Sequence, residues 1–172
     1  MTVGLGIVVR DKGCVLACDS RVMAGYSIVS DDCEKFVLCG SAVALVSGND
    51  GGLVDAIKGS RNLVQLHKRA LTYTVDTNLT WDLLIWDRTT SRLYLLDQAG
   101  SFLPLGATAA IGRGGEMAQG FLDAFAKAPV SLVEASARAQ AGVVATCRRN
   151  AACGGLVRVI VVPQRGRVVV AA

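Results

Sequence analysis

Apolar and polar residues alternate near the start of the chain, which predicts a first β-strand over residues 3–9. One face of this strand carries Val3, Leu5, Ile7 and Val9. The opposite face carries Thr2, Gly4, Gly6 and Val8. A strand face lined by glycine lets another backbone or a ligand approach closely. The letters RDKG then predict a turn, and residues 14–18 predict a returning strand.

The pattern stays strand-like until about residue 47 and then takes on helical spacing. Three short strands are expected at residues 26–30, 35–39 and 42–47. Gly40 and Ser41 predict a tight turn between the last two strands. A helix is expected from Asn49, which with Asp50 could cap its start, to about Ala70. Its predicted buried face carries Leu53, Ile57, Val64 and Leu71.

The second half of the chain again places strands before helices. Strands are expected at residues 81–87, 92–97 and 101–105. The letters GRGG open a helix expected at residues 115–127, with Met117, Phe121, Ala124 and Phe125 on one side. Ser131 and Glu134 form a capping-box signature for another helix that ends near Arg149. A closing hairpin around PQRG is expected from residues 155–162 and 166–171.

This order of elements predicts an α+β fold in which sheets pack together and helices lie outside. The 172 residues suit one domain, residues 1–172, with a substantial core. Hydrophobic residues make up 52% of the chain and the mean hydropathy is +0.44, yet no apolar run approaches the roughly 18 residues of a membrane-spanning helix. No membrane partner, signal peptide or transit peptide is therefore expected. A soluble chain this apolar is expected to bury surface against copies of itself.

Charge and cysteine content narrow the function classes further. The formal net charge is +4, but the basic residues are scattered and do not alternate with aromatic residues, so no nucleic-acid partner is expected. The six cysteines form no CxxC pair and His67 is the only histidine, so neither a metal site nor a cofactor is expected. Most cysteines lie in apolar stretches and are interpreted as small buried hydrophobes in a reducing cytoplasm.

Thr2 is the first candidate for a catalytic residue, as a nucleophile. Removal of Met1 would leave Thr2 with a free α-amine beside its own hydroxyl, and an N-terminal amine is one known way to activate a threonine nucleophile. The amine's ordinary pKa of roughly 7.7–8.0 suits proton transfer near neutral pH. A chain that begins Met-Thr is common, so this feature alone favours an ordinary second residue.

The residues around Thr2 change that interpretation. The segment TVGLGIVVRDKGCVLACDSRVMAGYSIVSDDCEKFVL, followed by ALVSGNDGG, resembles the N-terminal half of proteasome β-subunits and of HslV, the bacterial proteasome-related protease. Later, AAIGRGGEMAQGFLDAF and ATCRRNAACGGLVRVIVV resemble their Gly-rich turn with its helix and the passage into a late strand. The small bacterial proteasome homologues are the most similar branch. This resemblance implies a four-layer αββα sandwich, the Ntn-hydrolase fold.

The resemblance also implies roles for individual residues. Thr2 would be the nucleophile, Lys35 would place a positive charge near its hydroxyl, and Asp19 would hold Lys35. The Gly48 backbone N–H would stabilise the oxyanion of a tetrahedral intermediate. The alternative for Asp19 and Lys35 is a plain structural ion pair.

A second set of positions falls near the specificity pocket that the resemblance implies. These positions are Val22, Cys33, Val46 and Asp50, with Met23 at a position whose backbone pairs with the peptide. Three of them are small and apolar, which favours a medium apolar side chain before the cut bond, while Asp50 could favour a basic one. The alternative is that these are simply core residues.

Three supporting positions depart from the proteasome pattern. Arg113 replaces a serine, Asn150 replaces an acid and Cys153 replaces a second serine of the group that orients the N-terminal amine. Arg113 could point toward Lys35, or toward a ring interface or inner cavity. Only about thirty residues separate Gly48 from Trp81, so the helix layer is expected to be shortened between residues 49 and 80.

The leading hypothesis is therefore a cytoplasmic threonine endopeptidase that forms a homo-oligomeric double ring. A tetradecamer is expected, with a dodecamer as the alternative. Its substrates would be peptides or unfolded proteins, and an ATP-dependent unfoldase is a possible partner for which no docking motif is evident. The alternatives are a catalytically idle or structural ring subunit and an Ntn amidohydrolase that acts on small amides.

Overall fold

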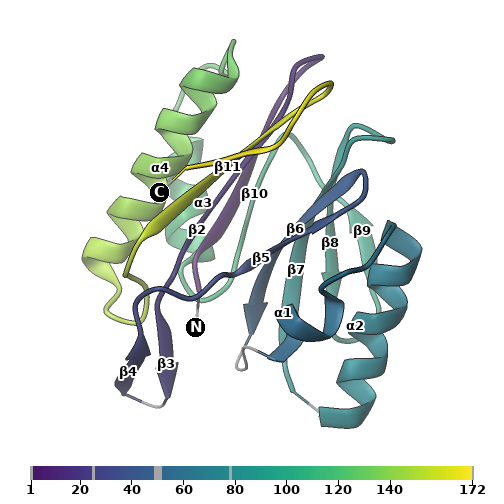
Figure 1. Cartoon of the computed structure of the whole chain (residues 1–172). Helices are drawn as coiled ribbons and strands as arrows, with labels where there is room; N and C mark the ends of the chain where they lie inside the picture. The colour runs from purple at the N-terminus through teal and green to yellow at the C-terminus, as the bar shows by residue number, and fades with distance from the viewer. Residues whose placement is uncertain (1, 25, 49–51, 78, 172) are drawn as a thin grey trace.

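Two five-stranded antiparallel sheets face each other and form the body of the molecule (Figure 1). The computed structural model describes residues 2–24, 26–48, 52–77 and 79–171. The first sheet has the strand order β10 (Thr108–Ile111), β1 (Gly4–Val9), β2 (Gly13–Asp19), β11 (Val157–Pro163) and β12 (Val169–Ala171). The second has the order β5 (Phe36–Cys39), β6 (Ala42–Gly48), β7 (Trp81–Asp87), β8 (Arg92–Asp97) and β9 (Phe102–Pro104). A separate hairpin joins β3 (Val22–Ala24) to β4 (Ser27–Ser30).

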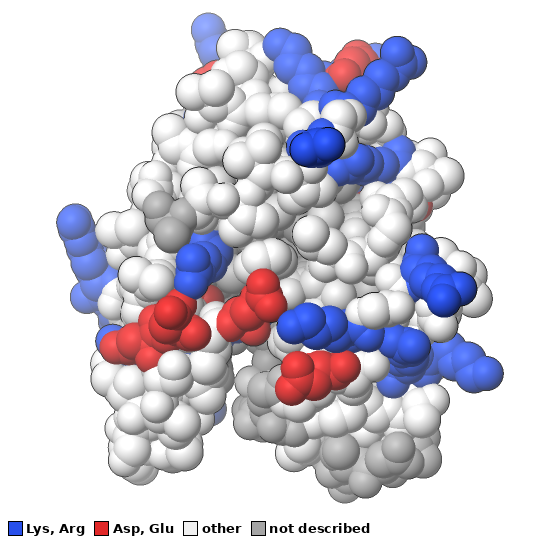
Figure 2. All heavy atoms as spheres, in the orientation of Figure 1, with Lys and Arg blue, Asp and Glu red and all other residues white. Residues whose placement is uncertain are grey.

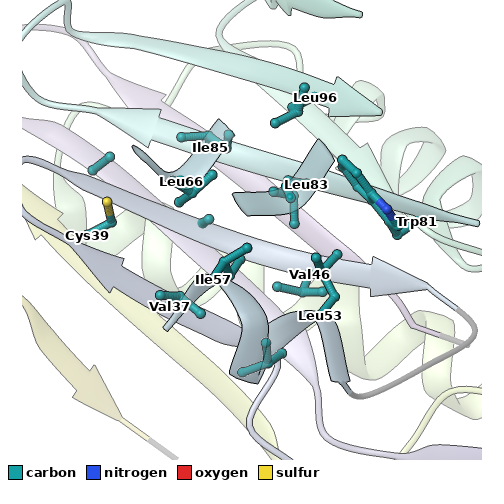
Figure 3. Packing of buried hydrophobic residues seen from close by; sticks show 14 residues of the cluster. Val37, Cys39, Val46, Leu53, Ile57, Leu66, Trp81, Leu83, Ile85 and Leu96 are labelled. Atoms are coloured by element: carbon teal, nitrogen blue, oxygen red, sulfur yellow. The ribbon is translucent and has the colours of Figure 1, made fainter. Parts of the chain in front are cut away.

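Helices cover the outer face of each sheet. On the first sheet α3 (Gly115–Asp123) and α4 (Leu132–Arg149) pack over β1, β2 and β11. On the second, α1 (Gly52–Ile57) and α2 (Leu63–Thr77) pack through one buried cluster, in which Leu53 and Leu66 point toward the strands (Figure 3). A third cluster, which includes Leu16, Leu45 and Trp86, fills the space between the sheets. The predicted mixed α/β class is confirmed.

The alternation predicted for the first strand sorts its residues between two clusters. Val3, Leu5, Ile7 and Val9 all lie in the cluster under α3 and α4. The glycines of the opposite face meet the second sheet, because a Cβ at Gly6 would lie 3.2 Å from Leu93 and 3.3 Å from Leu84. The close approach expected at the glycine face is thus made by side chains of the facing sheet.

The helix expected from residue 49 to 70 is wrong as one element. The chain forms α1, which has six residues, and then the separate α2. Gly59 interrupts the helical path with a φ of +74°, a conformation that favours glycine. Val64, predicted on the buried face, is exposed. The predicted caps Asn49 and Asp50 lie outside the described residues.

Other boundaries differ less. The helix expected to reach residue 127 ends at Asp123, and its buried residues are Gly115, Ala118 and Leu122, while Met117 is exposed. The short strands β3 and β10 were not expected, because neither shows a clear apolar period. The Gly40–Ser41 turn, the PQRG hairpin and the Ser131 cap are confirmed, and the Ser131 hydroxyl accepts a hydrogen bond from the Glu134 N–H at 3.1 Å.

Charge is gathered unevenly over the surface. In Figure 2 lysine and arginine side chains collect at the upper end, over the turns that join β1 to β2 and β11 to β12. Those turns carry Arg10, Lys12, Arg165 and Arg167. The basic residues that are scattered along the sequence are therefore partly gathered in space, at the end remote from the N-terminus. Within the described residues, no helix is long and apolar enough to cross a membrane.

Candidate active site

The polar centre of the molecule is Asp19, whose side chain is fully buried at the end of β2. Its Oδ1 accepts hydrogen bonds from the Lys35 ammonium at 2.9 Å and from the Val3 backbone N–H at 3.0 Å. Its Oδ2 accepts one from the Gly154 N–H at 2.9 Å. Burying a carboxylate is costly unless it is paired and hydrogen-bonded, and these three donors meet that requirement. The structure thus brings Asp19 and Lys35 together.

Thr2 lies beside this pair and is itself only 3% exposed. The carboxylate oxygen that accepts from Val3, the residue after Thr2, also accepts from Lys35. The Lys35 ammonium and the Val3 backbone nitrogen thus bind the same oxygen atom of Asp19, so the two nitrogens are at most two hydrogen-bond lengths apart. The Thr2 carbonyl accepts a hydrogen bond from the Gly114 N–H at 3.3 Å. Thr2 is in this way held from both sides, by β2 and by the turn before α3.

A second layer of contacts holds the Gly154 segment against β2. The Arg21 guanidinium donates to Asp31 at 2.7 Å and to the Ala151 carbonyl at 3.0 Å. The pKa of Asp31 is lowered from its usual value because of the hydrogen bond from Arg21. The Gly154 carbonyl accepts from the Arg21 N–H at 2.9 Å, and a Cβ at Gly154 would fall 2.5 Å from the guanidinium carbon. Arg21 therefore packs closely on Gly154, and a side chain at this position would displace the guanidinium.

The three positions that depart from the proteasome pattern are used differently here. Asn150 ends α4, and its side-chain oxygen accepts from the Ala152 N–H at 3.1 Å in a local turn. Cys153 is buried, which raises the pKa of its thiol to about 12, so it is neutral at physiological pH. Arg113 is exposed and lines a cavity together with Ser47 and Gly48.

The positions predicted to bind substrate are only partly brought together. Val22, Met23 and Cys33 are half-buried at the β3 hairpin and in the segment after it. Val46 is buried in the cluster under α1 and α2, where Figure 3 shows it beside Leu53. Its backbone N–H donates to the Lys35 carbonyl at 2.8 Å, which fixes β6 against the Lys35 segment. Asp50 lies outside the described residues.

The cavity beside Thr2 contains residues that the sequence did not point to. It has a volume of about 380 Å³, and its walls include Ser47, Asp82, Asp97 and Arg113. Gly112, one of its lining residues, lies against Thr2, because a Cβ there would lie 2.2 Å from the Thr2 carbonyl oxygen. Polar residues are common near the ends of strands, so the sequence alone does not mark Asp82 and Asp97 as part of a site. Their proximity follows only from the pairing of β7 with β8.

Asp82 is expected to reduce stability at neutral pH. Burial, and secondarily the charge of Asp97, raise its pKa, so folding favours the protonated form. That stabilisation is complete below the ordinary pKa of an aspartate and is lost as pH rises through the raised pKa. We expect Asp82→Asn to raise Tm by about 2 °C at pH 7 and by much less at pH 3.5. Thermal unfolding at both pH values checks this, with exposed Asp55→Asn as the control. An equal gain at both would contradict it.

The architecture and this centre define a mixed α/β protein of two facing sheets, in which a buried pair of Asp19 and Lys35 lies beside the start of β1. The family model described as Proteasome subunit matches residues 55–162, and the chain belongs to this family. The match spans Arg113, Asn150 and Cys153, but it begins after Thr2, Asp19, Lys35 and Gly48. No curated protein matches the chain.

Proposed function

We propose that this proteasome-family subunit is a threonine endopeptidase, with Thr2 as its N-terminal nucleophile after removal of Met1. The observation that carries the proposal is the shared Asp19 oxygen, which joins the Lys35 ammonium to the backbone next to Thr2. A positive charge held there favours the ionised form of the Thr2 hydroxyl over the neutral one. The proposal places the whole chain in one domain of the Ntn-hydrolase fold, with a four-layer αββα arrangement.

The reaction would proceed in two balanced steps. In the first, the Thr2 α-amine takes the proton of its own hydroxyl, and the oxygen attacks the peptide carbonyl. The Gly48 N–H donates to the oxyanion that forms. The C–N bond then breaks, and the ammonium returns its proton to the leaving amine. In the second step water attacks the ester on Thr2 and gives a proton to the α-amine. The ester C–O bond then breaks, the ammonium returns this proton to the Thr2 oxygen, and the acid product leaves.

A second candidate function has its own support. Asn150 is occupied in a local turn and the Cys153 thiol is neutral, so the group that orients the amine in the proteasome pattern is altered here. Such a chain could be a catalytically idle ring subunit. The two candidates differ in one observable property, the reactivity of Thr2.

The experiment that separates them is covalent labelling. Intact mass would first establish whether Met1 is removed. The protein would then be treated with a peptide epoxyketone or a β-lactone, and the adduct mapped by peptide sequencing. Loss of the Met1 mass and an adduct on Thr2, absent in Thr2→Ala, support the peptidase. Processed protein that takes no label, or protein that retains Met1, supports the idle subunit.

We also propose that the subunit assembles into a cytoplasmic homo-oligomeric double ring, a tetradecamer or alternatively a dodecamer. The β3–β4 hairpin supports this, because it projects from the sheets in Figure 1 and exposes Tyr26, Ile28 and Val29. Exposed apolar side chains grouped on one element are typical of interaction surfaces. Native mass spectrometry tests the assembly, and a monomer at micromolar concentration would contradict it.

A further inference from the structure

The face of the second sheet that packs on the first sheet is apolar along most of its length and becomes polar at the end next to Thr2. Residues directly opposite each other in antiparallel strands point to the same face, so side chains stand in rows across β6, β7 and β8. Two successive rows are apolar, Val43–Trp86–Leu93 and Leu45–Leu84–Leu95. The next row is polar and consists of Ser47, Asp82 and Asp97. The apolar contact between the sheets therefore ends in a row that carries two carboxylates.

This polar row forms one wall of the cavity beside Thr2. Across from it lie Gly112 and Arg113, in the turn after β10. A Cβ at Gly112 would lie 2.2 Å from the Thr2 carbonyl oxygen and 2.7 Å from the Ser47 hydroxyl. Gly112 therefore lies between the backbone of Thr2 and the polar row. Its volume of about 380 Å³ is within the range of pockets that hold small ligands.

The cavity lies on the other side of β6 from Val46, one of the predicted apolar specificity positions. Val46 precedes Ser47 in the strand, so their side chains point to opposite faces. Val46 is buried against the helices α1 and α2, whereas Ser47 faces Gly112. The two halves of a substrate leave the scissile bond in opposite directions. If the half before the cut lies toward Val46, the departing half lies toward this cavity.

The charges in the cavity favour a cation. The pKa of Asp97 is lowered because the Ser101 backbone donates a hydrogen bond to its carboxylate, at 3.0 Å, so Asp97 is ionised at neutral pH. Arg113 lines the cavity, but among the described residues it forms no ion pair with either carboxylate. No group of three His, Cys, Asp or Glu side chains able to hold a metal occurs in the described part of the chain. An organic cation fits this arrangement better than a metal ion.

We propose that this cavity, the leaving-side pocket, binds the part of the substrate that departs as the amine product, and that Asp82 and Asp97 select a lysine or arginine side chain there. This inference rests on the proposed peptidase function and specifies its substrates. A cation between the two carboxylates relieves their mutual repulsion and forms charge-assisted hydrogen bonds in a partly desolvated site. The pocket thus prefers substrates with a basic residue shortly after the cut bond.

The test uses internally quenched peptides that differ at one position. Lysine, norleucine or glutamate is placed at each of the first three positions after the cut, and kcat/KM is measured with the processed, assembled protein. We expect lysine to be favoured over norleucine by roughly tenfold at one position, the effect of one charge-assisted hydrogen bond. Glutamate at that position is expected to be the poorest of the three.

Variants of the pocket test the assignment. Asp97→Asn is expected to bring the lysine-to-norleucine ratio close to one, whereas Arg113→Gln is expected to increase it by removing the competing cation. Asp123→Asn, an exposed carboxylate on α3, is the matched control and is expected to leave the ratio unchanged. A circular dichroism spectrum and a melting curve for each variant separate loss of preference from loss of fold.

The outcomes distinguish this inference from the proposed function. Peptide cleavage and a Thr2 adduct without any preference for lysine, or with a preference that survives Asp97→Asn, overturn the leaving-side pocket and leave the peptidase standing. Failure of both cleavage and Thr2 labelling overturns the proposed function, and the pocket with it. A lysine preference that Asp97→Asn removes and Asp123→Asn retains supports both.

Discussion

Asp19→Asn is expected to lower the free energy of unfolding by about 3–5 kcal/mol, the usual cost of removing one partner from a buried ion pair. The Lys35 side chain is only 7% exposed and would lose the negative charge of its partner. The asparagine would also turn an NH₂ group toward one of the three donors that now bind the carboxylate. Thr2 labelling is expected to be lost as well, because Val3 and Lys35 are held by the same oxygen.

Urea unfolding followed by circular dichroism measures this loss. Asp11→Asn is the matched control, because Asp11 is exposed and its φ of +59° is a conformation that asparagine tolerates. The double variant Asp19→Asn with Lys35→Met is expected to be less destabilised than the sum of the two single variants, since both partners of one interaction are removed. Strict additivity of the two losses would show that the pair is not coupled.

Gly112→Ala is expected to reduce Thr2 reactivity by at least about a hundredfold, the loss typical of a displacement of roughly 1 Å in a reacting group. The new Cβ would lie 2.2 Å from the Thr2 carbonyl oxygen, which is backbone and cannot rotate away. Gly112 also has a φ of +82°, which is strained for alanine. Either Thr2 or the turn that carries Gly112 would have to shift, which changes the position of Thr2 relative to Asp19 and Lys35.

The rate of Thr2 labelling by a β-lactone checks this expectation. Gly120→Ala is the control for the same substitution, because a Cβ at Gly120 meets no atom within 4 Å and lies in α3. That variant is expected to label normally and to gain up to about 1 kcal/mol of stability, since alanine is the better helix former. Normal labelling of Gly112→Ala would contradict the close contact between Gly112 and the Thr2 carbonyl.

Much of the fold could be predicted from residue spacing, because the six- and seven-residue strands and α4 carry enough residues to show an apolar period. The boundaries of β7, β8 and the end of α4 agree with their apolar periods. The division between α1 and α2 could not be read this way, since Gly59 breaks the helix while apolar residues continue on both sides. Three-residue strands such as β3 are set by pairing with a neighbour, and their own sequence carries too few residues for a period.

The site was less accessible to such reasoning. Resemblance to a family pattern predicts Thr2, Asp19 and Lys35 as site residues. The structure adds the hydrogen bonds by which one Asp19 oxygen joins Lys35 to the backbone of Val3, the residue after Thr2. The Gly154 N–H could not be predicted as a donor to Asp19, because almost every residue type carries a backbone N–H. Asp82 and Asp97 stand fifteen positions apart, and only the β7–β8 register makes them neighbours.

The Gly154 contact has a consequence for protein synthesis. Asp19 and Gly154 are 135 positions apart along the chain, and Gly154 lies three residues before the start of β11, which pairs with β2. During synthesis on the ribosome, Thr2, Asp19 and Lys35 are therefore made long before Gly154, whose N–H is the third donor to the Asp19 carboxylate. If the proposed peptidase activity is correct, the enzyme stays inactive during its own translation, because the surroundings of Asp19 are completed only when almost the entire polypeptide has emerged.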